Sequence, residues 1–480
     1  MNTEKSKETS HTINKIINFK PQHAKKGIVF PLLVCSIVSL LMVLLWRFIP
    51  HPMIFISVGL APIAILIVLR QPFFFILLFV IFSFFRIHEV FPQIYNFKIP
   101  LLLSLASLGS LGWHVLISRE VTIYWRSELT VMSIFFVLVF VGVVLASNRP
   151  IAIEYFKGIY WKIIMMTFAI AWLSRNEKDF ALASRLITFF GLLVGAVAIS
   201  NQINGIGLVE GTRVTIGREF GSVLGDPNDL ALVLLFPVAF ASSLIMTAKV
   251  GSLTKLLGII SALTLFMAIM ATQSRGGLLG MMAIFGVYGY RRIQSKTLFI
   301  TIAILVAGAL FVFAGISDRA SGGAAEAGID ASAMGRLYAW EAAFGMAVHN
   351  PLTGVGINNF YSNYYYYSPH WDGLNHAVHS TWFGVLAETG FFGLIVFMYC
   401  IYLLVKTSLQ SLDTIEKHLH LVTPAIHAAA QAIFSGLLGT IVSATFLTQG
   451  FTWPIYILAA LVVAITQWVD INLPKKITSA

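Results

Sequence analysis

Long apolar segments recur along the chain from Ile28 to Val469, and short polar loops that carry lysine or arginine separate them. Most approach the roughly 20 residues that an α-helix needs to cross a bilayer, and none alternates polar with apolar residues as a membrane β-strand does. The pattern predicts an all-α protein, a polytopic membrane bundle of 12–14 transmembrane helices, because the short segments 72–85 and 160–173 can be re-entrant or merged with a neighbour. The fourteen segments are 28–46, 53–69, 72–85, 101–118, 129–147, 160–173, 181–201, 229–247, 256–273, 277–290, 297–315, 381–405, 429–447 and 453–470.

The composition agrees with a membrane protein. Of 480 residues, 58% are hydrophobic and only 11% are charged, and the mean hydropathy is +0.83. Soluble domains carry about 25% charged residues, so a soluble enzyme is excluded. The formal net charge of +11 then indicates topological bias and contact with membrane lipids, and not nucleic-acid binding. The two cysteines, Cys35 and Cys400, lie inside apolar segments, so the sequence has neither a disulfide framework nor a CxxC metal site.

The basic residues predict the orientation of the chain. Residues 1–27 are polar and contain six lysines, and no small-residue cleavage site follows them, so we expect a retained cytoplasmic tail. With this tail inside, the tail and inner loops hold 21 lysines and arginines and the outer loops hold 11, in agreement with the positive-inside rule. The long loops 202–228 and 316–380 are then outside. The chain divides into the tail, a membrane bundle over 28–201 and a second membrane region over 202–480.

Two of the outer arginines lie close together in a glycine-spaced loop. Arg213 and Arg218 are five residues apart, so both can face one anion. Asp226 begins a turn before the next helix, for which we expect Asn228 or Asp229 as the N-cap. Positive charge works against the topological bias on this side, and a fixed anionic ligand would explain it. The alternative is an ordinary loop whose arginines contact lipid phosphates.

Two further arginines occupy the starts of predicted helices. Arg275, in the segment Ser274-Arg275-Gly276-Gly277, lies between two apolar segments, where a guanidinium usually faces a cavity or a partner. The alternative is a tight hairpin with a snorkelling arginine. Arg336 lies near the amino end of an amphipathic helix predicted over 333–348, where free amides and a guanidinium together suit a phosphate. The alternative is an interfacial helix anchored by Arg336 and Trp340.

Two histidines lie where the longest outer loop enters a membrane helix. His376 and His379 are three residues apart, and Glu388 follows nine residues after His379. A histidine at such a position can serve as a general base, although one or both can also be plain loop residues. A zinc site is disfavoured, because no carboxylate or cysteine completes a recognised ligand spacing. The aromatic residues nearby indicate an interfacial belt or a sugar-stacking surface; they are Tyr364, Tyr365, Tyr366, Tyr367, Trp371 and Trp382.

Five short motifs follow one another between Arg213 and Phe397. They are Gly225-Asp226-Pro227-Asn228-Asp229-Leu230-Ala231, Ser274-Arg275-Gly276-Gly277, Gly335-Arg336 with Trp340, Asn350-Pro351-Leu352-Thr353-Gly354-Val355-Gly356, and His379 with Ala387-Glu388-Thr389-Gly390. In this order, around a long outer loop between membrane helices, they resemble the O-antigen ligase and O-antigen polymerase superfamily of bacterial envelope glycan assembly. Residues 1–200 resemble only a generic membrane bundle.

The resemblance implies a fold and a reaction. The fold would be similar to that of GT-C type glycosyltransferases, with a large, partly helical periplasmic loop and region 202–480 as the catalytic part. Similar proteins take a polyprenyl-pyrophosphate-linked glycan as donor at the periplasmic face of the bacterial inner membrane. They transfer it to a hydroxyl of a lipid A–core or of a lipid-linked repeat unit, with inversion, without a metal and without a cofactor.

The resemblance also implies roles for the candidate residues. His379 would be the general base, but family members usually show His-Asn where this chain has His379-Ser380, which keeps His376 open as the base. Asp226 and Glu388 would support the site. The pyrophosphate would be bound by arginines, for which this chain offers Arg213, Arg218, Arg275 and Arg336.

Two other classes of protein remain as alternatives. A transporter or flippase of lipid-linked oligosaccharide would show inverted repeats and candidates near the bilayer midplane, whereas the polar candidates here gather at one face. A non-catalytic scaffold would not need arginines and histidines in its longest outer loops. Between ligase and polymerase no residue decides, although the long polar tail and the tyrosine-rich outer loop favour a polymerase of O-antigen or exopolysaccharide.

Overall fold

The computed structural model describes residues 33, 36–41, 43–44, 52–313 and 331–474. It has two units, Met1–Arg70 and Gln71–Ala480. Helix α3 (Pro52–Arg70) belongs to the first unit. The tail 1–27, most of the segment 28–46 and the residues 316–330 of the long outer loop lie outside the described residues.

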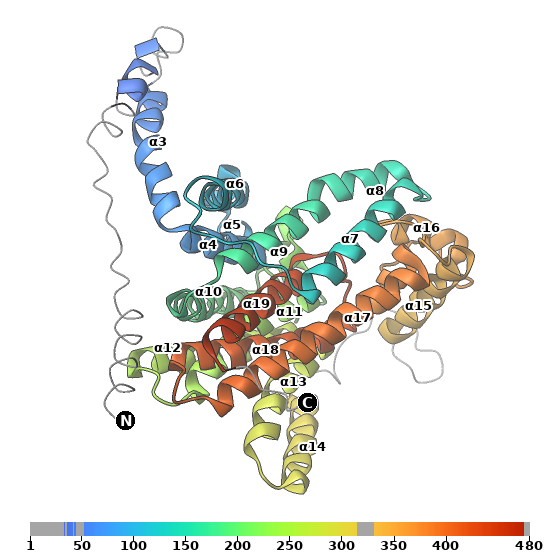
Figure 1. Ribbon diagram of the computed structural model, residues 1–480. Coiled ribbons are helices and arrows are strands. Elements are labelled where there is room, and N and C mark those ends of the chain that lie inside the picture. The colour runs from blue at the N-terminus through green and yellow to red at the C-terminus, as the bar shows by residue number, and fades with distance from the viewer. Residues whose placement is uncertain (1–32, 34–35, 42, 45–51, 314–330, 475–480) are drawn as a thin grey trace, which may run out of the picture. The chain divides into compact units, whose positions relative to one another are not determined.

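All regular secondary structure in the described residues of the second unit is helical, apart from one isolated β-bridge between Val209 and Arg213 (Figure 1). Its helices are α4 (Pro72–Phe84), α5 (Ile87–Val90), η1 (Pro92–Phe97), α6 (Ile99–Gly112), η2 (Trp113–Ile117), α7 (Ser127–Val144), α8 (Arg149–Tyr155), η3 (Phe156–Tyr160), α9 (Trp161–Leu173), α10 (Glu177–Asn204), η4 (Arg218–Phe220), η5 (Val223–Gly225), α11 (Pro227–Met246), α12 (Ser252–Thr272), α13 (Arg275–Arg292), α14 (Lys296–Phe313), α15 (Ala331–His349), α16 (Phe360–Tyr367), α17 (Thr381–Lys417), α18 (Pro424–Ala444) and α19 (Trp453–Asn472).

The predicted all-α, multi-pass membrane architecture is confirmed. Nine helices of the described residues are long and apolar enough to cross a membrane, and the apolar segments on either side of Gln71 make a tenth if they count as one span. The short segment predicted over 160–173 is the second half of a continuous span, Arg149–Leu173, which passes from α8 through a π-helical turn into α9.

Three predicted segments are not among these spans for identifiable reasons. Most of segment 28–46 lies outside the described residues. Segment 277–290 forms α13, but Arg275, Arg291 and Arg292 at its ends lower the hydropathy of the helix. Segment 297–315 forms α14, whose described apolar part, Lys296–Ala309, is short.

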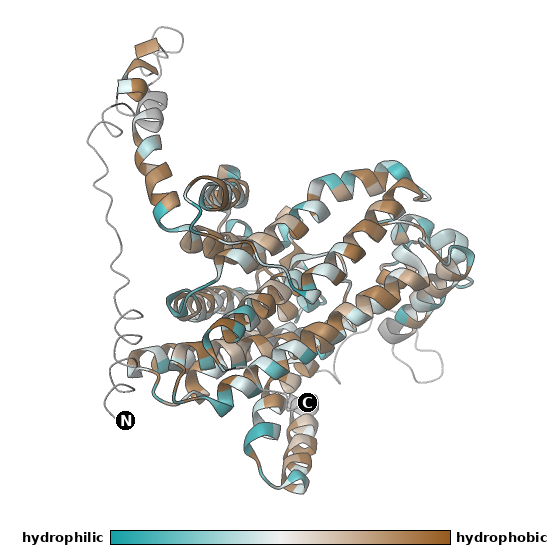
Figure 2. Ribbon diagram, viewed as in Figure 1, coloured by the Kyte–Doolittle hydropathy of each residue, from teal (hydrophilic) through white to brown (hydrophobic). Residues whose placement is uncertain are grey.

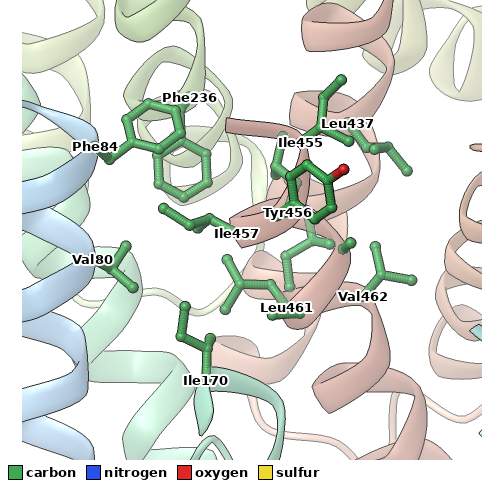
Figure 3. Packing of buried hydrophobic residues seen from close by; sticks show 14 of the residues in the cluster. Val80, Phe84, Ile170, Phe236, Leu437, Ile455, Tyr456, Ile457, Leu461 and Val462 are labelled. Atoms are coloured by element: carbon green, nitrogen blue, oxygen red, sulfur yellow. The ribbon is translucent and has the colours of Figure 1, made fainter. Parts of the chain in front are cut away.

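Helices α11 and α19 form the centre of the second unit. Most of their side chains are buried, and α11 packs against α10, α12, α13 and α18. Figure 3 shows residues of α4, α9, α11, α18 and α19 meeting in this core, where the rings of Phe84 and Phe236 lie 4.5 Å apart. The peripheral helices instead expose leucine and isoleucine, and the apolar colour extends along most of their length in Figure 2. A lipid bilayer covers such surfaces.

The helices of the second unit end at two opposite faces, and contacts between loops or helix ends show which ends lie together. On one face, the loop after α10 binds the end of α12 through Val214 N–H and Ala271 C=O at 3.1 Å, and Ser222 binds Glu89 of α5. On the other face, Arg291 of α13 pairs with Asp413 of α17 at 2.6 Å. The described parts of both long loops, 202–228 and 316–380, lie on the first face.

Candidate functional site

A cavity of about 300 Å³ opens on the face that carries the two long loops. Its walls come from the starts of α11, α13 and α15 and from the loop between α18 and α19. The structure therefore brings two of the predicted arginines, Arg275 and Arg336, into one cavity. The lining residues are Asn228, Ser274, Arg275, Gly276, Leu279, Arg336, Leu337, Trp340, Phe446 and Leu447.

A tight turn between α12 and α13 places Arg275 at the cavity. Gln273 closes α12 in the left-handed conformation, with φ of 48°, and the buried Ser274 caps α13 by accepting the Gly277 N–H at 3.1 Å. Gly277 is required here, because a Cβ at this position would overlap with Ala231 of α11. The glycine pair after Arg275 therefore lets α13 pack closely against its neighbours while its first residue faces the cavity.

Helix α15 brings Arg336 and Trp340 to the same wall, since residues four apart lie on one face of a helix. The Trp340 indole N–H donates to the Val378 carbonyl at 3.1 Å, and its ring stacks on Phe383 of α17 with an interplanar angle of 8°. These two contacts fix the start of α15 against the segment that carries His379.

His379 is not among the lining residues; it lies at the entrance to α17, next to Val378, whose carbonyl binds the cavity residue Trp340. It follows Val378, has a positive φ of 43°, and precedes Ser380, which caps α17 by accepting the Phe383 N–H. Burial lowers the pKa of His379 below its ordinary value of 6.5, and the positive charge of Arg336 lowers this pKa further. The Asp226 carboxylate acts in the opposite direction. The imidazole is therefore neutral and able to accept a proton near pH 7.

His376 is differently placed. Its Nε2 atom lies 2.9 Å from the Asp372 carboxylate, and both side chains are largely exposed. The hydrogen bond from His376 lowers the pKa of Asp372. Among the described residues, no three histidine, cysteine, aspartate or glutamate side chains converge in an arrangement that could hold a metal ion.

Asp226 and Arg213 both act on the start of α11. Asp226 is the N-cap, since its carboxylate accepts the amide N–H of Asn228 at 2.7 Å and that of Asp229, so the expectation of Asn228 or Asp229 as the cap was wrong. Arg213 is only 3% exposed; it donates to the Thr272 carbonyl at 3.1 Å and to the Asn228 side-chain oxygen at 3.0 Å. Arg213 thus lies behind the cavity wall and holds Asn228, which lines it.

Arg218 and Glu388 lie outside the cavity lining. Arg218 is exposed and donates to the Gly225 carbonyl at 3.1 Å. Glu388 is 7% exposed, and its carboxyl oxygens accept the backbone N–H groups of Asn358 at 2.8 Å and Phe360 at 3.2 Å. Glu388 therefore holds the loop before α16.

A break in α17 holds the same loop by its backbone. At Gly390 the helix adopts φ of 70° and ψ of −173°, and a Cβ there would overlap with the Pro351 carbonyl. Val355 N–H donates to the Ala387 carbonyl at 2.8 Å, and Phe391 N–H donates to the Pro351 carbonyl at 2.9 Å. We call residues 331–380 the outer module; these bonds and Glu388 attach it to α17.

Comparison with known families identifies this part of the chain. Residues 260–398, which contain the α12–α13 turn, α15, His379 and the break in α17, match the family model described as O-antigen ligase. This segment belongs to the O-antigen ligase family. The resemblance inferred from the motifs is thus confirmed over these residues, and Arg275, Arg336 and His379 all lie within the O-antigen ligase domain. No curated protein matches the chain.

The cavity also takes residues from outside the O-antigen ligase domain, and the sequence analysis missed most of them. Phe446 and Leu447 line it from the loop between α18 and α19. That loop is fixed by Thr381, whose hydroxyl donates to the Leu447 carbonyl at 2.6 Å, and by Gln449, whose side chain donates to Asp229 at 2.9 Å. The loop 445–452 contains no charged residue, so only its polar but uncharged composition could have indicated that it contributes to the site.

Proposed function

We propose that the protein is a metal-independent inverting glycosyltransferase of cell-envelope polysaccharide assembly. It transfers a polyprenyl-pyrophosphate-linked glycan to an acceptor hydroxyl at the periplasmic face of the bacterial inner membrane. The observation that carries this proposal is the cavity in the O-antigen ligase domain, which Arg275 and Arg336 both line, together with His379, which lies within the field of Arg336.

The donor's pyrophosphate is assigned to Arg275 and Arg336. Each guanidinium can bind phosphate oxygens in bidentate fashion, and Arg336 lies in the second turn of α15. As the bond between the anomeric carbon and the phosphate oxygen breaks, negative charge grows on the pyrophosphate, and fixed cations stabilise this charge most in the transition state. The apolar walls formed by Leu279, Leu337 and Phe446 suit the first isoprene units of the carrier.

His379 is assigned as the general base. The acceptor oxygen attacks the anomeric carbon from the side opposite the pyrophosphate, and its proton passes to the neutral imidazole, so the configuration inverts. The resulting imidazolium lies within the field of Arg336, which favours its later loss of the proton. Asp226 partly offsets this repulsion and orders the start of α11.

The other predicted residues receive supporting roles. Arg213 positions Asn228 at the cavity wall, and Glu388 holds the outer module in place. Arg218 and the pair of His376 with Asp372 do not line the cavity, and we assign them to loop structure.

Alanine variants of the two histidines test the assignment of the base. His379→Ala should fold, retain binding of the lipid-linked donor and lose transfer by roughly 10²- to 10⁴-fold, the usual contribution of a general base. His376→Ala is the matched control and should retain transfer, because it faces exposed Asp372. Full transfer by His379→Ala, or loss in His376→Ala alone, would overturn the assignment.

Glycan analysis of a deletion strain separates the two acceptor classes. Long chains that remain on the lipid carrier indicate a ligase, whereas accumulated single repeat units indicate a polymerase. Normal surface glycan with no accumulated carrier-linked material would contradict both.

A further inference from the structure

Helix α16 exposes aromatic side chains that burial does not explain. Phe360 and Tyr364 face the interior of the outer module and are almost fully buried. On the remaining surface, Tyr361, Tyr365 and Tyr366 are 59%, 51% and 75% exposed. An eight-residue helix needs only its buried stripe to pack, so a second, exposed set of rings points to an interaction surface.

Trp371 extends this surface beyond the helix. Its ring is 45% exposed and lies 4.6 Å from the ring of Tyr365, at 78°, while Tyr365 and Tyr366 lie 5.1 Å apart. Edge-to-face packing of this kind holds the rings at fixed angles and leaves large parts of their faces open. We call Tyr361, Tyr365, Tyr366 and Trp371 the aromatic platform.

Helix α15 lies between the aromatic platform and the cavity, since it contributes residues to the cavity and one ring contact beside the platform. Arg336 and Leu337 line the cavity, and the next residue of α15, Tyr338, stacks on His370 with ring centroids 3.9 Å apart. His370 directly precedes Trp371 in the chain. Tyr338 and Arg336 are two residues apart and therefore point to different sides of α15, so a chain-like ligand whose reacting end lies at Arg336 would have to pass around α15 to reach the platform.

The charges around the platform indicate which ligand it takes. Between Arg336 and Lys406 the sequence contains no lysine or arginine. A surface that docks on an anionic bilayer normally carries such residues. Instead, the exposed carboxylates of Glu341 and Asp372 lie beside His370 and His376. Carboxylates accept hydrogen bonds from hydroxyl groups, and open aromatic faces pack against the apolar C–H faces of pyranose rings.

We propose that the aromatic platform binds an uncharged saccharide chain, several sugars away from the residue that is transferred. The proposal rests on the proposed function and extends it, because it gives the glycan a second contact beyond the pyrophosphate. The platform then contributes affinity for long chains and not the chemical step, which stays with Arg275, Arg336 and His379.

The test is saturation-transfer NMR on the full-length protein in nanodiscs. The probe is the set of oligosaccharides released by mild acid from the host strain's own envelope polysaccharide. We expect the double variant Tyr365→Ala/Trp371→Ala to bind them about tenfold more weakly than the wild type, since two ring contacts are lost. The control is Tyr399→Ala/Tyr402→Ala, two tyrosines of α17 with comparable exposure inside the membrane span, and its affinity should be unchanged.

Two results would overturn the proposal. The first is equal affinity of the platform variant and the wild type. The second is a nitroxide at Trp371→Cys that is relaxed by lipid-soluble oxygen and not by a water-soluble nickel chelate, which would place the platform in the bilayer interface. Because binding needs no turnover, a wild-type protein that binds the oligosaccharides but transfers nothing refutes the proposed function alone. Normal transfer without the platform effect refutes the platform alone.

Discussion

Replacing Glu388 with alanine should loosen the outer module from the membrane helix that carries it. The Glu388 side chain is 7% exposed and accepts two backbone N–H groups, those of Asn358 and Phe360, from the start of α16. Its removal leaves both amides without this acceptor; Phe360 is buried, whereas Asn358 is an exposed residue whose amide water can reach. A buried donor left unpaired costs about 1–3 kcal/mol, so we expect the free energy of unfolding of the module to fall by roughly 1–3 kcal/mol, mainly because of Phe360.

The glutamine variant gives a graded comparison. Glu388→Gln keeps the size of the side chain and one good acceptor, but its NH₂ group faces the second amide donor. We therefore expect about half of the alanine effect, on the order of 0.5–1.5 kcal/mol. Glu341→Gln is the control, because Glu341 lies in the same module but its side chain is 58% exposed, where substitutions usually change stability by less than about 0.5 kcal/mol.

Two measurements report on this loosening. Thermal unfolding in nanodiscs measures the whole protein, and limited chymotrypsin digestion measures opening of the tyrosine-rich α16 in particular. We expect Glu388→Ala to be cleaved within α16 at a much higher rate and to lose transfer as Arg336 and His379 lose their fixed positions. Wild-type unfolding temperature together with wild-type cleavage in Glu388→Ala would refute the reasoning.

Three further predictions follow from the cavity and the loops. Arg275→Lys should fail to restore transfer although charge is kept, because an ammonium lacks the bidentate geometry of a guanidinium; normal turnover by a normally expressed lysine variant would contradict the phosphate role. The acidic limb of the rate profile should lie below pH 6.5, because His379 has a lowered pKa and loses its base form only as the pH falls through that value; Arg336→Gln should shift this limb to higher pH, which kcat measured against pH will show. In spheroplasts, an impermeant thiol reagent should label Leu374→Cys but not Leu421→Cys, which lies on the opposite face; the reverse pattern would invert the topology.

The lengths of the apolar segments predicted most of the fold, because the bilayer sets the length of a spanning helix. The apolar pattern of segment 160–173 is short because Lys157 and Lys162 interrupt it, which left open whether the segment is a full span. In the structure the helix continues through the π-helical turn at Phe156–Tyr160, where the Trp161 indole donates to the Lys157 carbonyl. Hydropathy alone therefore underestimates the length of a membrane helix that contains charged residues.

For the candidate site, the sequence predicts which residue types are present but not the direction of their side chains. Arg213 and Arg275 look alike in sequence, since both lie within two residues of a glycine in an outer loop. Arg275 lines the cavity, whereas Arg213 is buried against the Thr272 carbonyl and the Asn228 side chain. The sequence indicates that an arginine lies near this face, but the direction of the Arg213 side chain depends on Asn228 and Thr272, which are 15 and 59 residues away in the chain.

Because of the break at Gly390, α17 depends on the outer module for hydrogen-bond partners, just as the module depends on α17 for its attachment. An interrupted membrane helix exposes backbone groups that lipid cannot satisfy, and here the module supplies the missing partners through Val355 and Pro351. The module is therefore not a separable soluble domain, and excising it would leave α17 with unpaired amide and carbonyl groups. During synthesis, Pro351 and Val355 leave the ribosome before α17 does, so the surface that completes this helix is already available when the helix enters the membrane.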